Sequence, residues 1–273
     1  MRVIIAAAGE ATRWGEYLGL PKHLAPTAAG EVLLSRTVAQ ARQISEDVHI
    51  LTPADVRYEL PPRRSRKVTW HEVPTHRNEY EHTRDLWSDT DRTVLLLGDV
   101  YFTDEAMARI AAGSPSAYRV FGRYRASKVT GTPYGEIFAA SWGPARHAQM
   151  DVHLAEVERL RAAGVCTRPP GWVLLRLWQG TPVRKHIVRP PIWVEIDDWT
   201  DDLDTSADYN RHPAFGVRPA VEHIADLAAT DPDAALTELQ KARPDLSLGE
   251  LVEELESTAA EVLAEQEAAN AGG

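Results

Sequence analysis

The chain has 273 residues and a net charge of −10, with 44% hydrophobic and 26% charged residues. This composition is typical of a globular protein, and the length suits one large α/β domain with an appendage. The negative charge argues against nucleic acid or anionic lipid as a partner, and no apolar stretch approaches the roughly 20 residues that span a bilayer. Cys166 is the only cysteine, which excludes an intrachain disulfide. Because the first residues also do not resemble a secretory leader, we expect a cytoplasmic protein.

Apolar runs alternate with helix-like segments over about the first 200 residues. We expect helices at 32–43, at 104–112 with Asp104 as N-cap, and at 147–163, closed by Gly164. Strands are expected at 3–8, 48–52, 67–73, 93–97, 118–122, 136–140, 173–178 and 192–196. Strands that alternate with helices predict an α/β fold in three layers, in which helices cover both faces of a mostly parallel sheet.

The composition changes near residue 216, and no strand candidate follows residue 218. Apolar residues between 248 and 263 mark one face of an acidic helix. The sequence therefore predicts a catalytic domain at 1–216 and a helical appendage at 217–273. Such a helix packs either on its own domain or on a second subunit, so a homo-oligomer built through the C-terminal helix is one of the two expectations.

The loop after the first strand carries a glycine and two nearby cations, Gly9, Arg13 and Lys22. A glycine at a strand end lets the backbone turn with an unusual φ and lets N–H groups face a phosphate. Arg13 adds a planar fork and Lys22 a point charge, which suit a triphosphate in an otherwise acidic protein. The alternative is a surface turn with two solvated cations. The spacing matches neither a phosphate loop nor a dinucleotide fingerprint.

The run from Val3 to Arg13, followed by Pro21-Lys22, resembles the signature of a nucleotidyltransferase superfamily. This superfamily includes sugar-phosphate nucleotidyltransferases, phosphocholine cytidylyltransferases and MobA-like NTP transferases, and its pattern is a strand, Ala-Ala-Gly-x-Gly-Thr-Arg, and then Pro-Lys. The resemblance implies a Rossmann-like fold of the GT-A type. It also implies Mg²⁺-dependent transfer of a nucleoside monophosphate from a nucleoside triphosphate to a phosphorylated small molecule, most readily a sugar phosphate.

The same resemblance assigns residues. It implies catalytic roles for Arg13 and Lys22, and nucleotide contacts at Ala7, Ala8, Gly9, Glu10, Ala11, Thr12, Arg13 and Gly98. Ala11 departs from the pattern, because the family carries its second glycine there. If the backbone must approach a phosphate closely at that point, the methyl group would loosen or tilt the nucleotide.

Two acidic regions are candidates for holding Mg²⁺. Asp99 follows a buried strand, and ligands of open α/β sheets bind outside the carboxyl ends of strands. On spacing alone Asp99 could equally cap the next turn, and the resemblance favours the metal. The dense acidic stretch at 197–208 ends like the family's Asp-Thr-x-x-Asp element, which implies Asp204 as the second ligand. Asp197 is the alternative, Asp208 is expected to cap the following helix, and a solvated acidic loop is the competing interpretation of the stretch.

The middle of the chain supplies further contacts through the resemblance. Asn78 and Thr83 would contact the base or ribose, although an exposed helix is equally compatible with this segment. Glu136 would accept hydrogen bonds from sugar hydroxyls, and Arg123 or Lys128 would hold the phosphate of the acceptor. His71, His76 and His82 match no zinc spacing and are expected to be surface residues.

The expected reaction is in-line attack by a phosphate oxygen of the acceptor on the α-phosphorus, with pyrophosphate as leaving group. This chemistry needs positioning and charge neutralisation more than a protein nucleophile. One rival is a GT-A glycosyltransferase, but such enzymes usually carry Asp-x-Asp where this chain has Asp99-Val100-Tyr101. The other is a non-catalytic nucleotide-binding or assembly protein, which Ala11 makes more plausible.

Overall fold

The computed structural model describes residues 1–59, 67–75, 78–166, 168–215, 227 and 231–242. These residues divide into two compact units. The first unit comprises residues 1–10, 34–128 and 132–202, and the second comprises 11–33, 129–131 and the residues from 203 onward. The expected boundary at 216/217 and the apolar face expected between 248 and 263 lie outside the described residues, and so does the expected oligomer contact.

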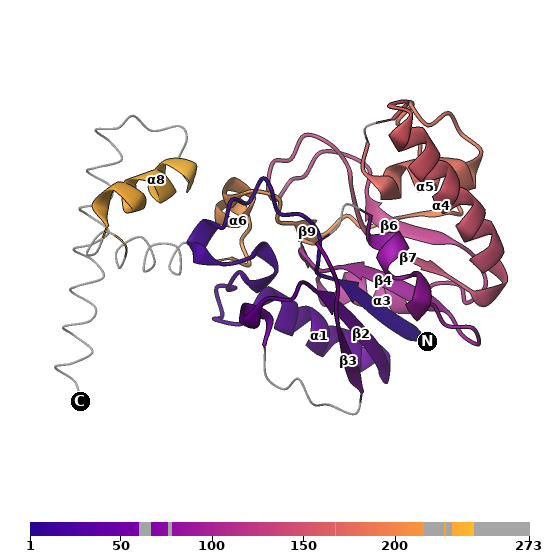
Figure 1. The fold of residues 1–273 in the computed structure, drawn as a ribbon, viewed down its shortest axis with the longest axis horizontal. Helices are drawn as coiled ribbons and strands as arrows, with labels where there is room; N and C mark the ends of the chain where they lie inside the picture. Colours follow the sequence, from indigo (N-terminus) through magenta and orange to yellow (C-terminus); the bar gives the residue numbers. More distant parts are fainter. Residues whose placement is uncertain (60–66, 76–77, 167, 216–226, 228–230, 243–273) are drawn as a thin grey trace. The chain divides into compact units, whose positions relative to one another are not determined.

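A seven-stranded mixed sheet forms the centre of the first unit, in the order β3-β2-β1-β4-β7-β6-β8 (Figure 1). Neighbouring strands are parallel from β3 to β4, whereas β7 runs antiparallel to both β4 and β6. The strands are β1 Arg2–Ala6, β2 Asp47–Thr52, β3 Val68–Glu72, β4 Thr93–Leu97, β6 Arg119–Arg123, β7 Glu136–Trp142 and β8 Trp193–Glu195. The expected mostly parallel sheet is therefore confirmed.

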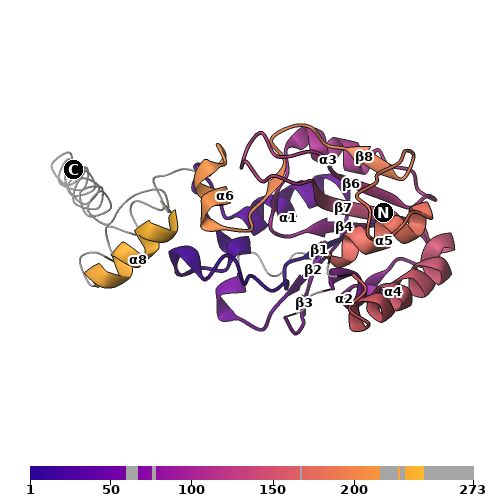
Figure 2. The same cartoon turned by 90° about the horizontal axis from the view of Figure 1, so that it is seen from above.

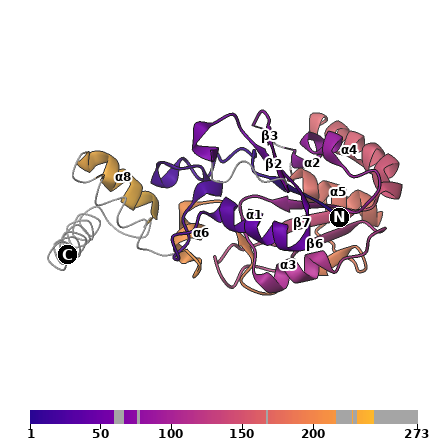
Figure 3. The same cartoon turned by 90° about the horizontal axis from the view of Figure 1, so that it is seen from below.

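Helices cover both faces of this sheet, as Figures 2 and 3 show from opposite sides. One face carries α2 (Glu79–His82), α4 (His147–Ala162) and α5 (Pro170–Gln179), and the other carries α1 (Leu33–Ile44) and α3 (Asp104–Ala111). Side chains alternate along a strand, so Ile4 and Leu95 join the core beneath α4 and α5 while Ile5 and Leu96 point to the opposite face. All four are fully buried, which explains the uninterrupted apolar runs in β1 and β4.

The expected strand at 173–178 is wrong, because this segment lies within α5. A continuous apolar run fits a buried strand and a buried helix equally well. The flanking residues decide between them: Pro170 occupies the first helical position, and Gly180 ends the helix in the left-handed conformation. Residues on all sides of this helix are buried, so no polar face interrupts the run.

Other helix boundaries follow local capping chemistry. Thr103, and not Asp104 as expected, is the N-cap of α3, because the Thr103 side chain accepts a hydrogen bond from the Ala106 N–H. The expected end of α4 is confirmed, since Ala162 is its last residue and Gly164 follows with a φ of +63°. No helix among the described residues combines the length and apolarity needed to cross a membrane.

The second unit has short helices and an aromatic core. Trp14, Tyr17 and Tyr209 are buried and meet edge-to-face, with ring centroids 5.5–6.0 Å apart. Tyr209 belongs to α6 (Ser206–Arg211), and α8 (Pro232–Ala242) contacts α6. Asp208 does cap α6, but from inside it: its carboxylate accepts from the Thr205 backbone in a capping box. Burial raises the pKa of Asp208.

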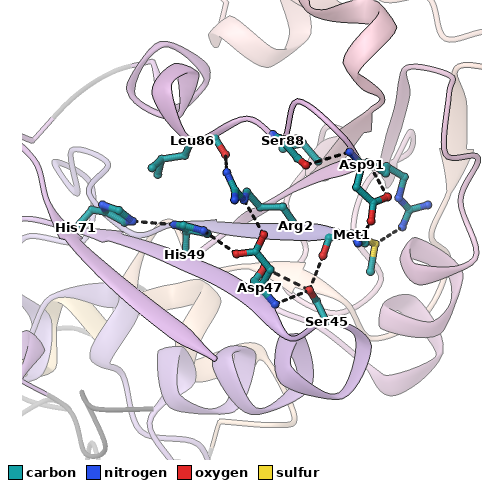
Figure 4. A network of polar contacts seen from close by, with 11 residues as sticks. Met1, Arg2, Ser45, Asp47, His49, His71, Leu86, Ser88 and Asp91 are labelled. Carbon is teal, nitrogen blue, oxygen red and sulfur yellow. Dashed lines mark hydrogen bonds and ion pairs between the residues drawn. The ribbon is translucent and has the colours of Figure 1, made fainter. Parts of the chain in front are cut away.

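A polar network crosses the edge of the sheet in the first unit (Figure 4). Nε2 of His49 lies 2.9 Å from Asp47 Oδ1, and Nδ1 of His49 lies 2.9 Å from Nε2 of His71. A carboxylate only accepts, so neutral His49 carries its proton on Nε2, and His71 donates to Nδ1. Arg2 completes the network by donating to Asp47 at 2.8 Å. His71 is therefore a structural residue rather than the expected surface histidine, whereas His76 lies outside the described residues.

Candidate active site

Two neighbouring strands, β1 and β4, end side by side in the first unit. The Gly98 N–H donates to the carbonyl of Ala6 at 2.8 Å, and a Cβ on Gly98 would lie 2.8 Å from both Ala6 O and Ala7 Cβ. Only glycine fits this approach without a shift of the backbone. The half-buried Asp99 follows directly, beyond the carboxyl end of β4. Asp99 thus occupies the position at which open α/β sheets bind ligands.

A second small sheet brings the acidic stretch beside this strand end. β5 (Val100–Tyr101) pairs antiparallel with β9 (Asp201–Asp202), and Val100 is opposite Asp202. Carboxylate oxygens of Asp202 and Glu136 lie within 4.8 Å of each other. Sequence reasoning did not select Asp202, because six aspartates lie in this stretch and nothing local shows which of them pairs with the segment after Asp99.

The loop after β1 turns at a different glycine from the one expected. Gly9 does not adopt a left-handed φ, and a Cβ built on it would contact nothing within 4 Å. The left-handed residues follow later, with φ +64° at Gly15, +58° at Glu16 and +61° at Leu18. Positive φ is unusual for Glu and Leu. The left-handed glycine expected at Gly9 is therefore Gly15. A side chain at Gly9 would point into open space beside the strand end.

In the second unit, both predicted cations meet the predicted metal ligand. Arg13 forms an ion pair with Asp204 Oδ2, and Lys22 Nζ lies 3.4 Å from Asp204 Oδ1. The Lys22 side chain is only 6% exposed, so its ammonium is removed from most water and depends on a carboxylate for compensation. These residues are 191 and 182 positions from Asp204, and the fold brings all three together.

Arg123 differs from its expected role of holding an acceptor phosphate. The Arg123 side chain is 7% exposed, and its guanidinium donates to the fully buried Asp201 at 2.6 Å. Ser127 also donates to Asp201. A guanidinium committed to a buried carboxylate supports the loop that follows β6 and is a poor direct phosphate ligand. Lys128 stays exposed, with Nζ 3.3 Å from Asp197, so this cation is the better candidate and Asp197 is its partner.

The two residues expected at the base or ribose have different surroundings. Thr83 is fully buried, where its hydroxyl donates to Tyr80 O and accepts from the Trp87 indole N–H. That hydroxyl is committed to the core, which corrects the expectation of a nucleoside contact. Asn78, in contrast, lines a cavity of about 430 Å³ that Glu10 also lines. Two residues with predicted nucleotide contacts thus share one cavity of the first unit.

Most of the chain matches the model of one known protein family. The family model described as the MobA-like NTP transferase domain matches residues 3–241. No protein of curated function matches the chain significantly.

Two solved structures of nucleotidyltransferases illustrate what the chain is similar to. A Bacillus anthracis protein assigned as a glucose-1-phosphate thymidylyltransferase superposes with a TM-score of 0.54 at 15% identity, over 78% of this chain and 94% of that chain. The CTP:phosphocholine cytidylyltransferase of Streptococcus pneumoniae has a TM-score of 0.45 at 12% identity, with 76% and 95% of the two chains covered. At such identities the first likeness establishes the Rossmann-like nucleotidyltransferase fold.

Proposed function

The chain belongs to the MobA-like NTP transferase family, and we propose that it transfers a nucleoside monophosphate from a nucleoside triphosphate to a phosphorylated small molecule, with release of pyrophosphate. A sugar phosphate is the proposed acceptor, and the cytoplasm is the proposed location. The observation that carries the proposal is the meeting of Arg13, Lys22 and Asp204 in the second unit. This cluster combines the cations that a triphosphate needs with the hard oxygen ligand that its metal needs.

The proposed chemistry needs no protein nucleophile. A phosphate oxygen of the acceptor attacks the α-phosphorus in line, the bond to the β-phosphate oxygen breaks, and pyrophosphate takes the electron pair. Arg13 binds phosphate oxygens through its planar fork, and Lys22 adds a compact charge from a buried position. Positive charges placed where negative charge develops stabilise the transition state.

The residues present fit a divalent cation. All candidate ligands are carboxylates, which suit Mg²⁺. The carboxylates of Glu136 and Asp202 lie close enough to repel each other, and a nearby cation would reduce this repulsion. Asp99 and Asp204 are the proposed Mg²⁺ ligands, with Asp197 as the alternative to Asp204. When bound, the ion neutralises charge on the phosphates and orients them.

The acceptor side of the proposal rests on two exposed or half-buried groups. Glu136, the first residue of β7, would accept hydrogen bonds from sugar hydroxyls, and Lys128 would bind the acceptor phosphate. The role proposed here for Arg123 is indirect, because its ion pair with Asp201 braces the strand end next to this loop.

The test is pyrophosphate release with each nucleoside triphosphate, alone and with a panel of sugar phosphates, phosphocholine and other phosphomonoesters. Release that requires both substrates supports the transferase. Nucleotide binding without release for any acceptor would favour a non-catalytic binding protein. Cleavage of a nucleotide sugar would favour the glycosyltransferase, against which the family assignment already argues.

A further inference from the structure

The segment from the end of α4 to β8 carries a high concentration of positive charge. Between residues 159 and 194 the sequence contains no Asp or Glu, although the whole chain has 40 of them against 30 Lys and Arg. The cationic side chains in this stretch are Arg159, Arg161, Arg168, Arg176, Arg184, Lys185 and Arg189. A local excess of one charge sign within a protein of the opposite net charge attracts small ligands that the rest of the surface repels.

The fold brings four of these cations together around His186. Arg176 lies on α5, where its Nε donates to Lys185 O and its Nη2 lies 3.0 Å from His186 Nδ1. Nη2 of Arg168 donates to Arg184 O at 3.5 Å, which ties the segment before α5 to the loop that follows it (Figure 1). We call this group, which consists of Arg168, Arg176, Arg184, Lys185 and His186, the basic cluster.

Arg176 is a buried cation that no carboxylate compensates. Its side chain is fully buried, and it donates to Trp172 O, Lys185 O and His186 Nδ1, none of which carries a negative charge. Burial, followed by the nearby Arg168, lowers the pKa of Arg176 to about 10, so the guanidinium stays charged at neutral pH. Buried charges are normally paired with an opposite charge, and in the described part of the chain no carboxylate bonds Arg176.

The basic cluster also has hydrogen-bond donors to offer to a ligand. Arg184 and Lys185 are exposed, and neither forms an ion pair with a carboxylate of the described residues. A guanidinium only donates, so His186 accepts from Arg176 at Nδ1, and neutral His186 carries its own proton on Nε2. The cluster therefore combines guanidinium groups, an ammonium and an imidazole N–H.

Tyr124 connects the basic cluster to the loop after β6. Its ring stacks on His186 with centroids 4.8 Å apart and an interplanar angle of 4°, and its hydroxyl donates to His186 O at 3.3 Å. The Tyr124 N–H donates to Glu195, so this carboxylate contacts Tyr124 rather than a cation of the cluster. Lys128, the proposed ligand of the acceptor phosphate, follows Tyr124 along the chain. A ligand in the basic cluster can therefore influence the segment that carries Lys128.

We propose that the basic cluster binds a phosphate group. A phosphate dianion accepts several hydrogen bonds at once, and guanidinium groups match its oxygens with two parallel bonds. It would also supply the negative charge that Arg176 lacks. Arg168 and His186 are half-buried, so salt screens a ligand there less than one on an open surface. The net charge of −10 argues against an extended polyanion as the occupant.

This inference goes beyond the proposed function and does not depend on it. The phosphate has two possible sources with the same chemistry: a second phosphate of the acceptor, or a free phosphate ion that acts as an effector. Binding of phosphate to the cluster needs no transfer reaction, so it can be found even if the proposed function fails.

The first experiment detects phosphate at His186 itself. In protein labelled with ¹⁵N-histidine, the ring signals of His186 are identified by their absence from His186→Gln, and inorganic phosphate is titrated at constant ionic strength. We expect a saturable change of these signals and a rise in the His186 pKa of roughly one pH unit, because a nearby dianion favours the charged ring. Signals that phosphate changes no more than chloride does would overturn the proposal.

The second experiment removes one exposed cation of the cluster. Lys185→Gln breaks no ion pair and keeps the backbone carbonyl that accepts from Arg176. It should weaken phosphate binding about tenfold, the value of one hydrogen bond to a charged group. Arg159→Gln is the matched control, since Arg159 belongs to the same stretch but pairs with Glu156 on α4. Unchanged phosphate binding by Lys185→Gln, or equal weakening by both variants, would contradict the assignment.

Kinetics separate the two sources of the phosphate. For a phosphate of the acceptor, a sugar bisphosphate should have a KM about tenfold below that of the monophosphate, and Lys185→Gln should remove the difference. For a free ion, inorganic phosphate should change the KM of a monophosphate acceptor in the wild type and not in Lys185→Gln. Displacement of phosphate from His186 by a single-stranded oligonucleotide, at lower concentration than by any phosphomonoester, would assign the cluster to nucleic acid and overturn the proposal.

Discussion

Lys22 Nζ lies 3.4 Å from Asp204 Oδ1, and Arg13 pairs with the other oxygen of the same carboxylate. Asp204 therefore shares its single negative charge between the two cations proposed to bind the triphosphate. Asp204 would hold the metal, and Arg13 and Lys22 would hold the phosphates, so we expect these three side chains to change partners when substrate binds.

Asp204→Asn should have opposite effects on binding and turnover. Removal of this charge weakens one contact of Arg13 and one of Lys22, so metal-free pyrophosphate should bind roughly tenfold more tightly, about the value of one hydrogen bond to a charged group. Transfer should nevertheless be lost, because a proposed metal ligand is missing. Isothermal titration calorimetry in EDTA measures the binding. Asp198→Asn is the control, since its exposed carboxylate bonds Thr103 and Thr200 instead. Unchanged or weaker pyrophosphate binding by Asp204→Asn would contradict the exchange.

Asp99→Asn should abolish transfer and leave the fold intact. Asp99 is half-buried and follows the last residue of β4 by two positions, so the isosteric amide disturbs no strand. Loss of one metal ligand should reduce kcat/KM by roughly 100-fold or more, since the metal supplies several kcal/mol of charge stabilisation. Pyrophosphate release over a range of Mg²⁺ concentrations measures the effect, and thermal unfolding checks the fold. Rates like those of the wild type would remove Asp99 from the metal site.

Gly98→Ala should destabilise the protein, whereas Gly9→Ala should not. The new Cβ at residue 98 would lie 2.8 Å from Ala6 O and Ala7 Cβ, and overpacking of this kind costs about 1–3 kcal/mol. The new Cβ at residue 9 meets nothing within 4 Å, and its φ suits alanine. Urea unfolding of both variants measures the free energies. Equal values would show that β1 and β4 do not need to approach so closely.

His71 should make the stability depend on pH. Burial, followed by the nearby His49 and Arg2, lowers the pKa of His71 below its ordinary value of 6.5. The unfolded chain then binds the proton more readily than the folded protein. The free energy of unfolding is therefore highest above pH 6.5 and decreases as the pH falls from there through the folded pKa.

His71→Gln should reduce this slope without abolishing it. Glutamine can still donate to His49 but has no titrating group in this range, while burial also lowers the pKa values of His153 and His186, which remain. For Asp47, burial acts to raise the pKa, but hydrogen bonds from Arg2 and His49 outweigh it and lower the pKa. The stability that Asp47 contributes is therefore lost only as the pH falls below 3.8. Urea unfolding between pH 7 and pH 5 measures the slope, and an unchanged slope in the variant would exclude His71 as a contributor.

Local sequence patterns were sufficient to predict many of the helix and strand bounds in the first unit. β4 has the bounds that its apolar run predicts, and α4 ends where Gly164 allows a left-handed residue. The apolar run of α5 was misassigned because burial on all sides erases the helical period. Its capping signals, Pro170 and Gly180, were present in the sequence and favour a helix.

The sequence by itself determined that Asp99 follows a buried strand. It also determined that Arg13 and Lys22 lie in the segment after the first strand, because both placements depend only on local spacing. Only the tertiary structure decided which carboxylate meets those cations, that Arg123 is committed to Asp201, and that Asn78 faces Glu158. These pairs are separated by 191, 78 and 80 positions. Many acidic residues are chemically equivalent in the sequence. Which of them pairs with a distant Arg, Lys or Asn therefore depends on how whole elements pack, because packing alone brings one carboxylate close to that side chain.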